Sequence, residues 1–208
     1  MFKKQLLRLF AGKFAQDKKK VILMDGNRFS RESVSANNRA KTSVIRTIKK
    51  EILDCYPSLT EYMEEVFPKK GVMNTATAKT AGTKVTFIMD EDMNILFFQI
   101  REEKPIPTLR TLHKFPNLLP KFQVDKGAIP FVLKGSDIFC RGLTSKGGKM
   151  DEVTKDTVVA IYAEGRVHAC AIGTTLMDTK TIREVNDGIA VTQYNYLGDG
   201  LWKLPHLR

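Results

Sequence analysis

Cysteine and long apolar runs are scarce in this 208-residue sequence. Its three cysteines, Cys55, Cys140 and Cys170, lie far apart, and no CxxC pair or adjacent pair of histidines accompanies them. This spacing argues against a zinc site and against a disulfide-linked scaffold, and it fits a reducing compartment. No uninterrupted apolar run approaches the roughly 20 residues that a membrane-spanning helix needs. We therefore expect no membrane span, and we expect the cysteines to be small buried side chains.

Motifs of the common catalytic sites are also missing. The sequence has no GxSxG motif and no GxxxxGK phosphate loop, and His113, His168 and His206 lack the spacing of metal ligands. Ser136-Asp137 and the acidic triplet at residues 90–92 have the composition of turns. We therefore expect neither an enzyme nor a bound metal or cofactor.

Acidic side chains are scarce in the first quarter of the chain. Residues 1–50 hold 14 Lys and Arg but only three acidic residues, a net charge of +11, whereas the remaining 158 residues sum to zero. Within that neutral remainder, Lys104 to Lys149 holds nine basic and two acidic residues, a net charge of +7. A local concentration of this kind is what a surface that follows a phosphate backbone requires.

A basic amphipathic segment, residues 1–25, opens the chain. It combines leucines and phenylalanines with lysines and arginine, and it has no acidic residue before Asp17. A short surface helix, an organelle-targeting segment and an unstructured basic arm all fit this pattern. The absence of serine before Ser30 speaks against targeting. We treat residues 1–25 as an extension that is separate from the domains after it.

Residues 26–117 are predicted to form an α+β domain. An apolar stripe at helical spacing predicts a helix from Thr42 to Tyr56, with Thr42 or Ser43 as its N-cap. Ser58 and Glu61 have the spacing of a capping box and predict a second helix. Residues 27–41 are expected to be irregular.

A β-hairpin is predicted for the rest of this domain. Lys84–Met89 alternates between apolar and polar residues, and Ile95–Ile100 is expected to pair with it. The polar stretch Lys69–Lys84 is expected to be a loop. Thr108 is predicted to cap a short helix, after which prolines at 116 and 120 mark the boundary of the next domain.

Residues 118–208 are predicted to form a small mixed β-barrel that begins with a strand–helix–strand unit, Gln123–Leu143. In this unit Gly135 would end a short helix whose apolar face is Ala128, Ile129, Val132 and Leu133. A brief buried strand at Ile138–Cys140 and a turn at Arg141-Gly142 would follow.

The rest of the barrel is expected to contain a hairpin, a helix and a final strand. Residues 157–163 and 167–174 have the pattern of a hairpin that turns at Glu164-Gly165. Asp178 is predicted to cap a helix that runs to Val185, and a strand is expected at residues 189–196, before a turn at Asp199-Gly200.

Four ordered motifs carry a resemblance to a known family: TSVIRTIKKEILDCYP, PTLRTLHKFPNLLPKFQVDKGAIPFVLKGSDIFCRGLTS, DTVVAIYAEGRVHACAIG and YLGDGLWKL. From about Arg28 to the C terminus, the chain resembles the malignant T-cell-amplified sequence protein family. These are translation factors with an N-terminal domain and a C-terminal PUA RNA-binding domain. The family begins near the position of Phe29, so the resemblance does not cover residues 1–25. Pro130 departs from the pattern, and we expect it to kink the helix or delay its start.

The resemblance implies a non-enzymatic, cytoplasmic translation factor. Members pair with density-regulated protein, which supplies a SUI-type domain. The pair acts on the small ribosomal subunit in reinitiation, in non-standard delivery of initiator tRNA, and in removing deacylated tRNA during recycling. The resemblance also implies that tRNA or ribosomal RNA is bound by the PUA domain.

The expected RNA-binding residues come from two sources. In PUA domains, RNA is bound by the first helix, the loop that follows it and the adjoining surface of the β-sheet. By resemblance, the matching residues here are Lys126, Gly127, Lys134, Gly135, Ser136, Arg141 and Gly142. Charge alone adds Lys114, Lys121, Lys146 and Lys149. Each glycine also has a plain turn explanation, and each lysine could simply be solvated.

Two other functions remain open on the sequence. One is a PUA module that acts in ribosome biogenesis or RNA modification. The other is a protein-interaction scaffold whose N-terminal domain is the working surface. The first would associate with pre-ribosomal particles, and the second would not depend on RNA.

Overall fold

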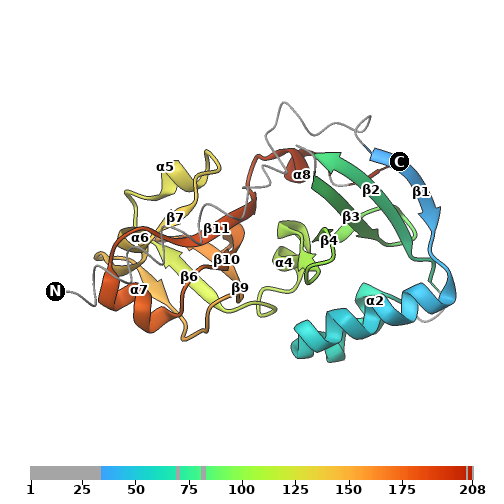
Figure 1. Ribbon diagram of the computed structural model, residues 1–208, viewed down its shortest axis with the longest axis horizontal. Helices are drawn as coiled ribbons and strands as arrows, with labels where there is room; N and C mark the ends of the chain where they lie inside the picture. Colours follow the sequence, from blue (N-terminus) through green and yellow to red (C-terminus); the bar gives the residue numbers. More distant parts are fainter. Residues whose placement is uncertain (1–33, 69–70, 81–82, 205, 208) are drawn as a thin grey trace. The chain divides into compact units, whose positions relative to one another are not determined.

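The computed structural model describes residues 34–68, 71–80, 83–204 and 206–207 (Figure 1). The predicted extension, residues 1–25, lies outside them. The described chain divides into two compact units, one of residues 119–197 and the other of residues up to 118 together with those from 198 onward. This division differs from the predicted domains 26–117 and 118–208 at the C-terminal end, and the two units are described separately here.

The N-terminal unit is built on a five-stranded antiparallel sheet. Its order is β1-β2-β3-β4-β5, so every neighbour in the sheet is also a neighbour in sequence. The strands are β1 (Val34–Arg39), β2 (Asn74–Thr80), β3 (Thr83–Met89), β4 (Ile95–Ile100) and β5 (Ile106–Pro107). The predicted hairpin is therefore confirmed as β3 and β4.

Among the described residues before residue 119, this unit has four helical elements, three of them short. They are α2 (Thr42–Cys55), the 3-10 helix η2 (Pro57–Tyr62), α3 (Met63–Val66) and α4 (Leu109–Lys114). Thr108 caps α4 by accepting a hydrogen bond from the backbone N–H of Thr111, as predicted. Buried aromatic rings of β3 and β4 form the centre of the core, together with Ile52, Leu109 and Leu112.

Three predictions for the N-terminal unit are wrong. The polar stretch at residues 69–84 contains β2, because Ala76 and Ala78 alternate with threonines and bury small side chains against the sheet. Within 27–41, residues 34–39 form edge strand β1. The capping box does not form: η2 and α3 have no side-chain cap, and Pro57 directs a 3-10 turn instead.

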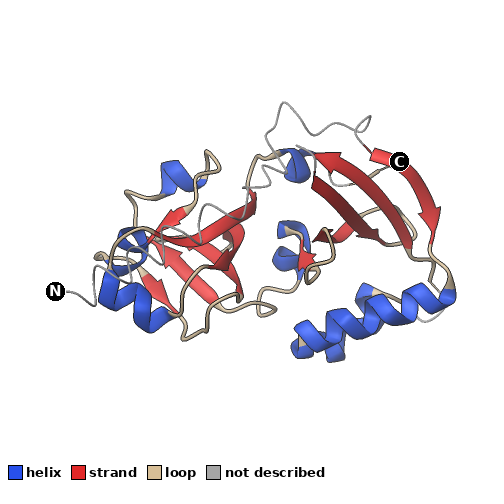
Figure 2. Ribbon diagram, viewed as in Figure 1, coloured by secondary structure: helices blue, strands red, loops and turns tan. Residues whose placement is uncertain are grey.

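The second unit contains a six-stranded mixed sheet that curls into a half-barrel (Figure 2). Its order is β7-β11-β10-β9-β6-β8, and β6 pairs with β9 in parallel while all other pairs are antiparallel. The strands are β6 (Lys121–Val124), β7 (Ile138–Phe139), β8 (Lys149–Met150), β9 (Val158–Ala163), β10 (Ala169–Thr175) and β11 (Ile189–Tyr196). The α+β class and the small mixed barrel are confirmed.

Among the described residues, this unit has three helices: α5 (Ile129–Val132), α6 (Cys140–Thr144) and α7 (Thr179–Val185). Asp178 caps α7, as predicted. Pro130 is the second residue of the four-residue helix α5, within the first turn, where its missing N–H would have no partner inside the helix. The expected turn at Arg141-Gly142 is wrong, because these residues lie within α6.

A last helix, α8 (Gly200–Lys203), belongs to the N-terminal unit by its contacts. Asp199 caps it by accepting from the backbone N–H of Trp202 at 2.7 Å. The Arg110 guanidinium of α4 lies 4.3 Å from the centre of the Trp202 ring and donates to the Trp202 carbonyl at 2.7 Å. The part of the chain that the structure describes has no helix both long and apolar enough to span a membrane.

Candidate nucleic-acid interface

The loop between β6 and α5 carries Lys126 and Gly127, and hydrogen bonds to the Asp125 carboxylate and to the Gly142 carbonyl hold it in place. The Asp125 carboxylate accepts from the backbone N–H of Ala128 at 2.8 Å and from the Ser145 hydroxyl. The backbone N–H of Asp125 in turn donates to the Gly142 carbonyl at 3.0 Å. These bonds fix the loop to α6 and to the residue after it, so Lys126 is presented from an ordered backbone.

Glu164 contacts both this loop and a second loop, residues 145–148, which carries Lys146. Its carboxylate accepts from the backbone N–H of Lys126 at 3.0 Å and lies against Gly147, where a side chain would collide with it. Gln123 donates to the Gly147 carbonyl at 2.6 Å from the same side. The Glu164 carboxylate therefore accepts a hydrogen bond from the loop that carries Lys126 and packs against the loop that carries Lys146.

Gly142 allows α6 to approach α5 closely. A Cβ atom at this position would lie 3.0 Å from the Cβ of Ala128, at the limit of close contact. Gly142 is half-buried, and its carbonyl already bonds to Asp125. Its role in the structure is helix packing, and its exposed neighbour Arg141 is the residue that α6 presents to solvent.

Gly135 and Ser136 lie between α5 and β7. Gly135 has φ of +82°, and a Cβ here would lie 2.9 Å from Cε1 of Tyr196 in β11. The backbone N–H of Ser136 donates to the Phe131 carbonyl at 3.0 Å. Below them, the buried Gln193 side chain donates to the Val132 carbonyl at 2.9 Å. Both predicted residues are half-buried, so they contribute to the site mainly through the conformation of their backbone.

The predicted cations fall into two groups. Six lie exposed on the second unit: Lys121, Lys126, Lys134, Arg141, Lys146 and Lys149. Lys114 is different, because it lies on α4 of the N-terminal unit and its ammonium is 3.0 Å from the Glu65 carboxylate. Ion pairs join Lys114 to Glu65, Lys180 to Glu184 and Arg183 to Glu152, and none of these three pairs involves Lys126, Lys134 or Arg141.

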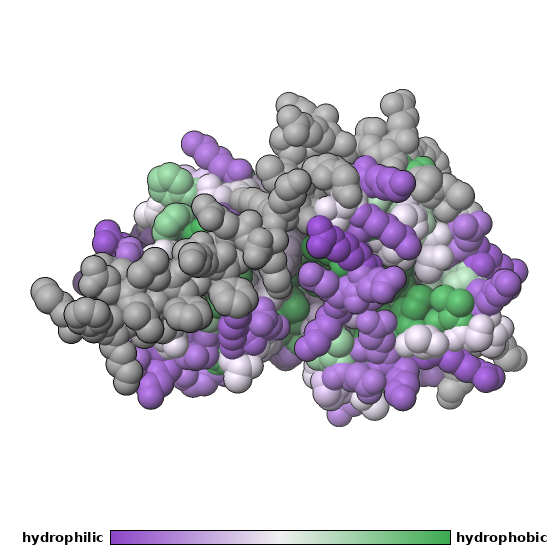
Figure 3. Space-filling model, in the orientation of Figure 1, coloured by the Kyte–Doolittle hydropathy of each residue, from purple (hydrophilic) through white to green (hydrophobic). Residues whose placement is uncertain are grey.

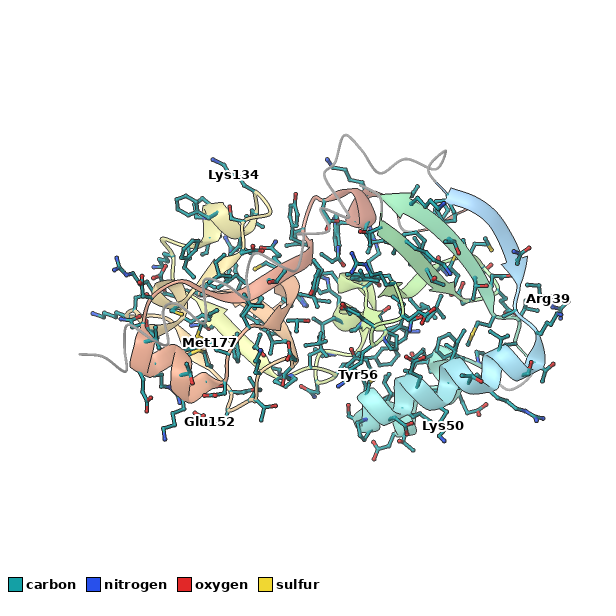
Figure 4. All side chains as sticks on the ribbon, in the orientation of Figure 1. Arg39, Lys50, Tyr56, Lys134, Glu152 and Met177 are labelled. Carbon is teal, nitrogen blue, oxygen red and sulfur yellow. The ribbon has the colours of Figure 1, made fainter. Side chains whose placement is uncertain are left out.

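Exposed apolar side chains accompany these cations, and sequence reasoning missed them. Phe131 is 63% exposed and Leu133 42% exposed on α5, and Phe139 is 57% exposed on β7. Figure 3 shows apolar surface over α5, and Figure 4 shows Lys134 pointing away from the same helix. The apolar face predicted for this helix is correct for Val132, which is buried, but wrong for Leu133. The expected burial of the strand at 138–140 is likewise wrong for Phe139.

Other candidate chemistry finds no support among the described residues. No cluster of His, Cys, Asp and Glu there could hold a metal ion. Burial raises the pKa of the Cys170 thiol to about 11 and also raises that of Cys140, which disfavours the reactive thiolate. In the acidic triplet, the Asp90 carboxylate accepts from the backbone and side chain of Asn94, as expected for a hairpin turn.

Comparison with protein families assigns a domain to each unit. Residues 29–116 match the Pre-PUA-like domain, and residues 120–197 match the PUA domain. Two solved archaeal structures share the fold: a PUA-domain protein of Aeropyrum pernix (TM-score 0.63, 22% identity, covering 84% of this chain and 94% of that one) and a hypothetical protein of Pyrococcus horikoshii (TM-score 0.65, 21% identity, covering 82% and 99%). The predicted PUA-type barrel is confirmed.

Curated relatives match over both domains. The Malignant T-cell-amplified sequence 1 homolog of Dictyostelium discoideum is 47% identical over 176 residues, which cover 84% of this chain and 94% of the relative. Malignant T-cell-amplified sequence 1 of Danio rerio is 43% identical and Malignant T-cell-amplified sequence 2 of Homo sapiens 41% identical, each over 84% of this chain and 94% of the relative. With this identity over most of its length and both domains in order, the chain belongs to the malignant T-cell-amplified sequence family.

Proposed function

We propose that this protein is a non-enzymatic translation factor that binds tRNA or ribosomal RNA through its PUA domain. In this proposal it acts in the cytoplasm on the small ribosomal subunit, together with density-regulated protein. The steps it would serve are reinitiation, delivery of initiator tRNA, and removal of tRNA in recycling. Its family and its PUA domain support the coarser statement that it is an RNA-binding, translation-related protein.

The observation that carries the proposal is the exposed basic surface around α5 and α6. Lys126, Lys134 and Arg141 are solvent-exposed, and the nearby carboxylates of Asp125 and Glu164 are turned to backbone donors. Lysine and arginine contacts to phosphates supply affinity without reading base sequence. A factor that recognises a tRNA or ribosomal RNA by its shape needs this kind of contact.

Co-sedimentation with purified small ribosomal subunits tests the proposal. The full chain is mixed with subunits in the presence and absence of density-regulated protein, and the pelleted fraction is measured against salt concentration. We expect salt-sensitive association that the partner strengthens. Absence of association under both conditions at low salt would contradict a role on this particle.

Ribosome biogenesis or RNA modification is the alternative for the same PUA domain. It predicts association with pre-ribosomal particles and a nuclear location, whereas the proposed function predicts a cytoplasmic one. Imaging of the tagged full-length chain, combined with sequencing of the RNAs that copurify with it, separates the two.

A further inference from the structure

A pocket of about 170 Å³ lies in the Pre-PUA unit, where α2, α3 and the turn between β3 and β4 contribute to its wall. Its apolar lining comes from Ile45 of α2, from Val66 and Phe67 at the end of α3, and from Val72 and Met73 before β2. A cavity of roughly 150 Å³ with apolar walls accommodates a benzene ring. The pocket therefore has the size for one aromatic side chain, and it is smaller than the roughly 300–1,000 Å³ of a small-molecule site.

Carboxylates gather at this pocket. Those of four residues line it: Glu65, Asp90, Glu91 and Asp92. Glu65 already pairs with Lys114, so most of the negative charge comes from the turn residues. Among the described lining residues the cation is Lys49, whose ammonium donates to the Phe67 carbonyl at 2.9 Å and lies 5.8 Å from the centre of the Phe67 ring. The pocket thus combines apolar walls with negative charge, which fits a positively charged segment with an aromatic side chain and repels the phosphates of RNA.

The chain itself contains a segment of this composition, residues 1–25. It holds seven basic and two acidic residues, a net charge of +5, and Arg8 and Lys13 are neighbours in sequence of its Phe10 and Phe14. Residues 51–103, which supply most of the pocket, hold ten acidic and five basic residues, a net charge of −5. The two segments are therefore complementary in charge, and the phenylalanines match the size of the apolar cavity.

The pocket lies within reach of residues 1–25 of the same molecule. Strand β1 begins at Val34 and rises about 3.3 Å per residue, so its last residue, Arg39, lies roughly 17 Å further on. Arg39 pairs with Asn74, which directly follows the pocket residue Met73. The connecting residues 26–33 can span up to about 28 Å. The tether is therefore long enough to bring residues 1–25 back along β1 to the pocket.

We propose that residues 1–25 dock on this pocket within one molecule, with the ring of Phe10 or Phe14 in the apolar cavity and with Arg8 and Lys13 against the carboxylates of the β3–β4 turn. A short tether holds its two ends at an effective concentration in the millimolar range, so even a weak contact between segment and pocket is populated. This inference goes beyond the proposed RNA-binding function and does not depend on it, because the pocket belongs to the Pre-PUA unit and the basic surface to the PUA domain.

Zero-length cross-linking of the full chain with a carbodiimide tests this docking, because the reagent joins an amine to a carboxylate only where the two are in contact. We expect cross-links from lysines of residues 1–25 to Glu91 or Asp92, identified by mass spectrometry, with a yield that dilution does not change. Phe10→Ala with Phe14→Ala removes both rings and keeps every charge. It should weaken docking by about 10- to 100-fold and lower the yield of these cross-links.

Tryptic cleavage within residues 1–25 provides a second readout, because docking shields the basic residues that trypsin recognises. Glu91→Gln with Asp92→Asn should speed this cleavage. The matched control, Glu102→Gln with Glu103→Gln, makes the same change in charge on exposed residues after β4 and should leave the rate at the wild-type value. Cross-links that vanish on dilution would overturn docking within one molecule in favour of a second copy. Cross-links that reach Glu102 and Glu103 equally, or cross-linking and cleavage that do not change when both rings are removed, would overturn the pocket as the docking site.

Discussion

Lys126 and Arg141 carry exposed positive charges on two segments that are joined by the hydrogen bond from Asp125 N–H to the Gly142 carbonyl. Replacing both with glutamate should reduce RNA affinity steeply. For single-stranded RNA, the slope of log affinity against log salt should become shallower by about 1.4, which corresponds to two lost phosphate contacts. Anisotropy titrations at several salt concentrations measure both quantities.

The control for this double variant is Lys50→Glu with Lys84→Glu, which makes the same change in net charge on exposed residues of α2 and β3. It should leave the slope close to the wild-type value. If both double variants lose affinity equally, the net charge of the protein, and not this surface, governs binding. Lys126 and Arg141 would then not be part of the RNA-binding site.

The glycine at position 135 is required by the fold, independently of any RNA contact. Its φ of +82° favours glycine, and Tyr196 fills the place where a Cβ would lie. A left-handed conformation alone costs a residue with a side chain about 1–2 kcal/mol, and Gly135→Ala should lower the free energy of unfolding by more than this amount. Chemical denaturation measures this loss.

Gly165→Ala provides the matched comparison, because Gly165 has a similar φ of +77° and open space around its Cβ position. It should show only the conformational cost. If the two alanine variants lose equal stability, the Tyr196 ring moves aside freely, and close packing at Gly135 contributes nothing.

Helix α7 owes its start to Asp178. The carboxylate accepts from the Thr181 N–H at 2.8 Å and the Thr181 hydroxyl at 3.1 Å. The backbone hydrogen bond holds the pKa of Asp178 below its ordinary value of 3.8. Because the folded-state pKa is the lower one, this stabilisation is complete above pH 3.8 and is lost as the pH falls through the folded-state value.

Asp178→Ala should therefore lower the free energy of unfolding by about 1 kcal/mol at neutral pH. Asp178→Asn keeps a capping oxygen without the titrating charge, so it should retain most of the stability at neutral pH and lose the acid-dependent part. Denaturant titrations at pH 7 and pH 3 compare the three proteins. An alanine variant as stable as wild type at pH 7 would show that the cap is dispensable.

Elements with a clear apolar period were predictable from the sequence, whereas those that depend on tertiary contacts were not. The helix that became α2 and the hairpin of β3 and β4 carry their pattern in large apolar side chains. In residues 74–79 of strand β2, which has the sequence NTATAKT, the buried residues are Ala76 and Ala78, so the strand resembles a polar loop until it is paired on both sides. Glycine is typical of turns, but Gly142 lies within α6, where a Cβ would come within 3.0 Å of Ala128.

The candidate site shows the same limit. Charge and resemblance selected Lys126, Lys134 and Arg141, and the structure exposes all three. Neither source could select Phe131 or Phe139, because an apolar residue in a short helix or strand is usually buried, and only the fold shows which face is left in water. The contact of Glu164 could not be predicted from the sequence either, because Glu164 is 38 residues away along the chain from Lys126, whose N–H donates to its carboxylate.

At the scale of the whole molecule, the chain leaves the PUA domain after β11 and ends on the Pre-PUA unit. Trp202 of α8 contacts two residues of α4: the Arg110 guanidinium over its face and His113, whose ring centre is 5.4 Å away, at its edge. The C-terminal motif YLGDGLWKL therefore begins in one domain and stabilises the other. Contacts of this kind make the stability of the Pre-PUA unit depend on residues that follow the PUA domain in sequence.

Trp202→Ala should consequently destabilise the Pre-PUA unit selectively. Truncation of a fully buried Trp costs about 3–5 kcal/mol, and Trp202 is only half-buried, so we expect about 2 kcal/mol. Native-state hydrogen exchange should show faster exchange of amides in α4 and β4, with those in β9, β10 and β11 unchanged. Trp202→Phe keeps a ring over Arg110 and should lose less. Equal loss of protection in β10 and β4 would mean that the two domains unfold as one cooperative body, because the same tryptophan would then support both.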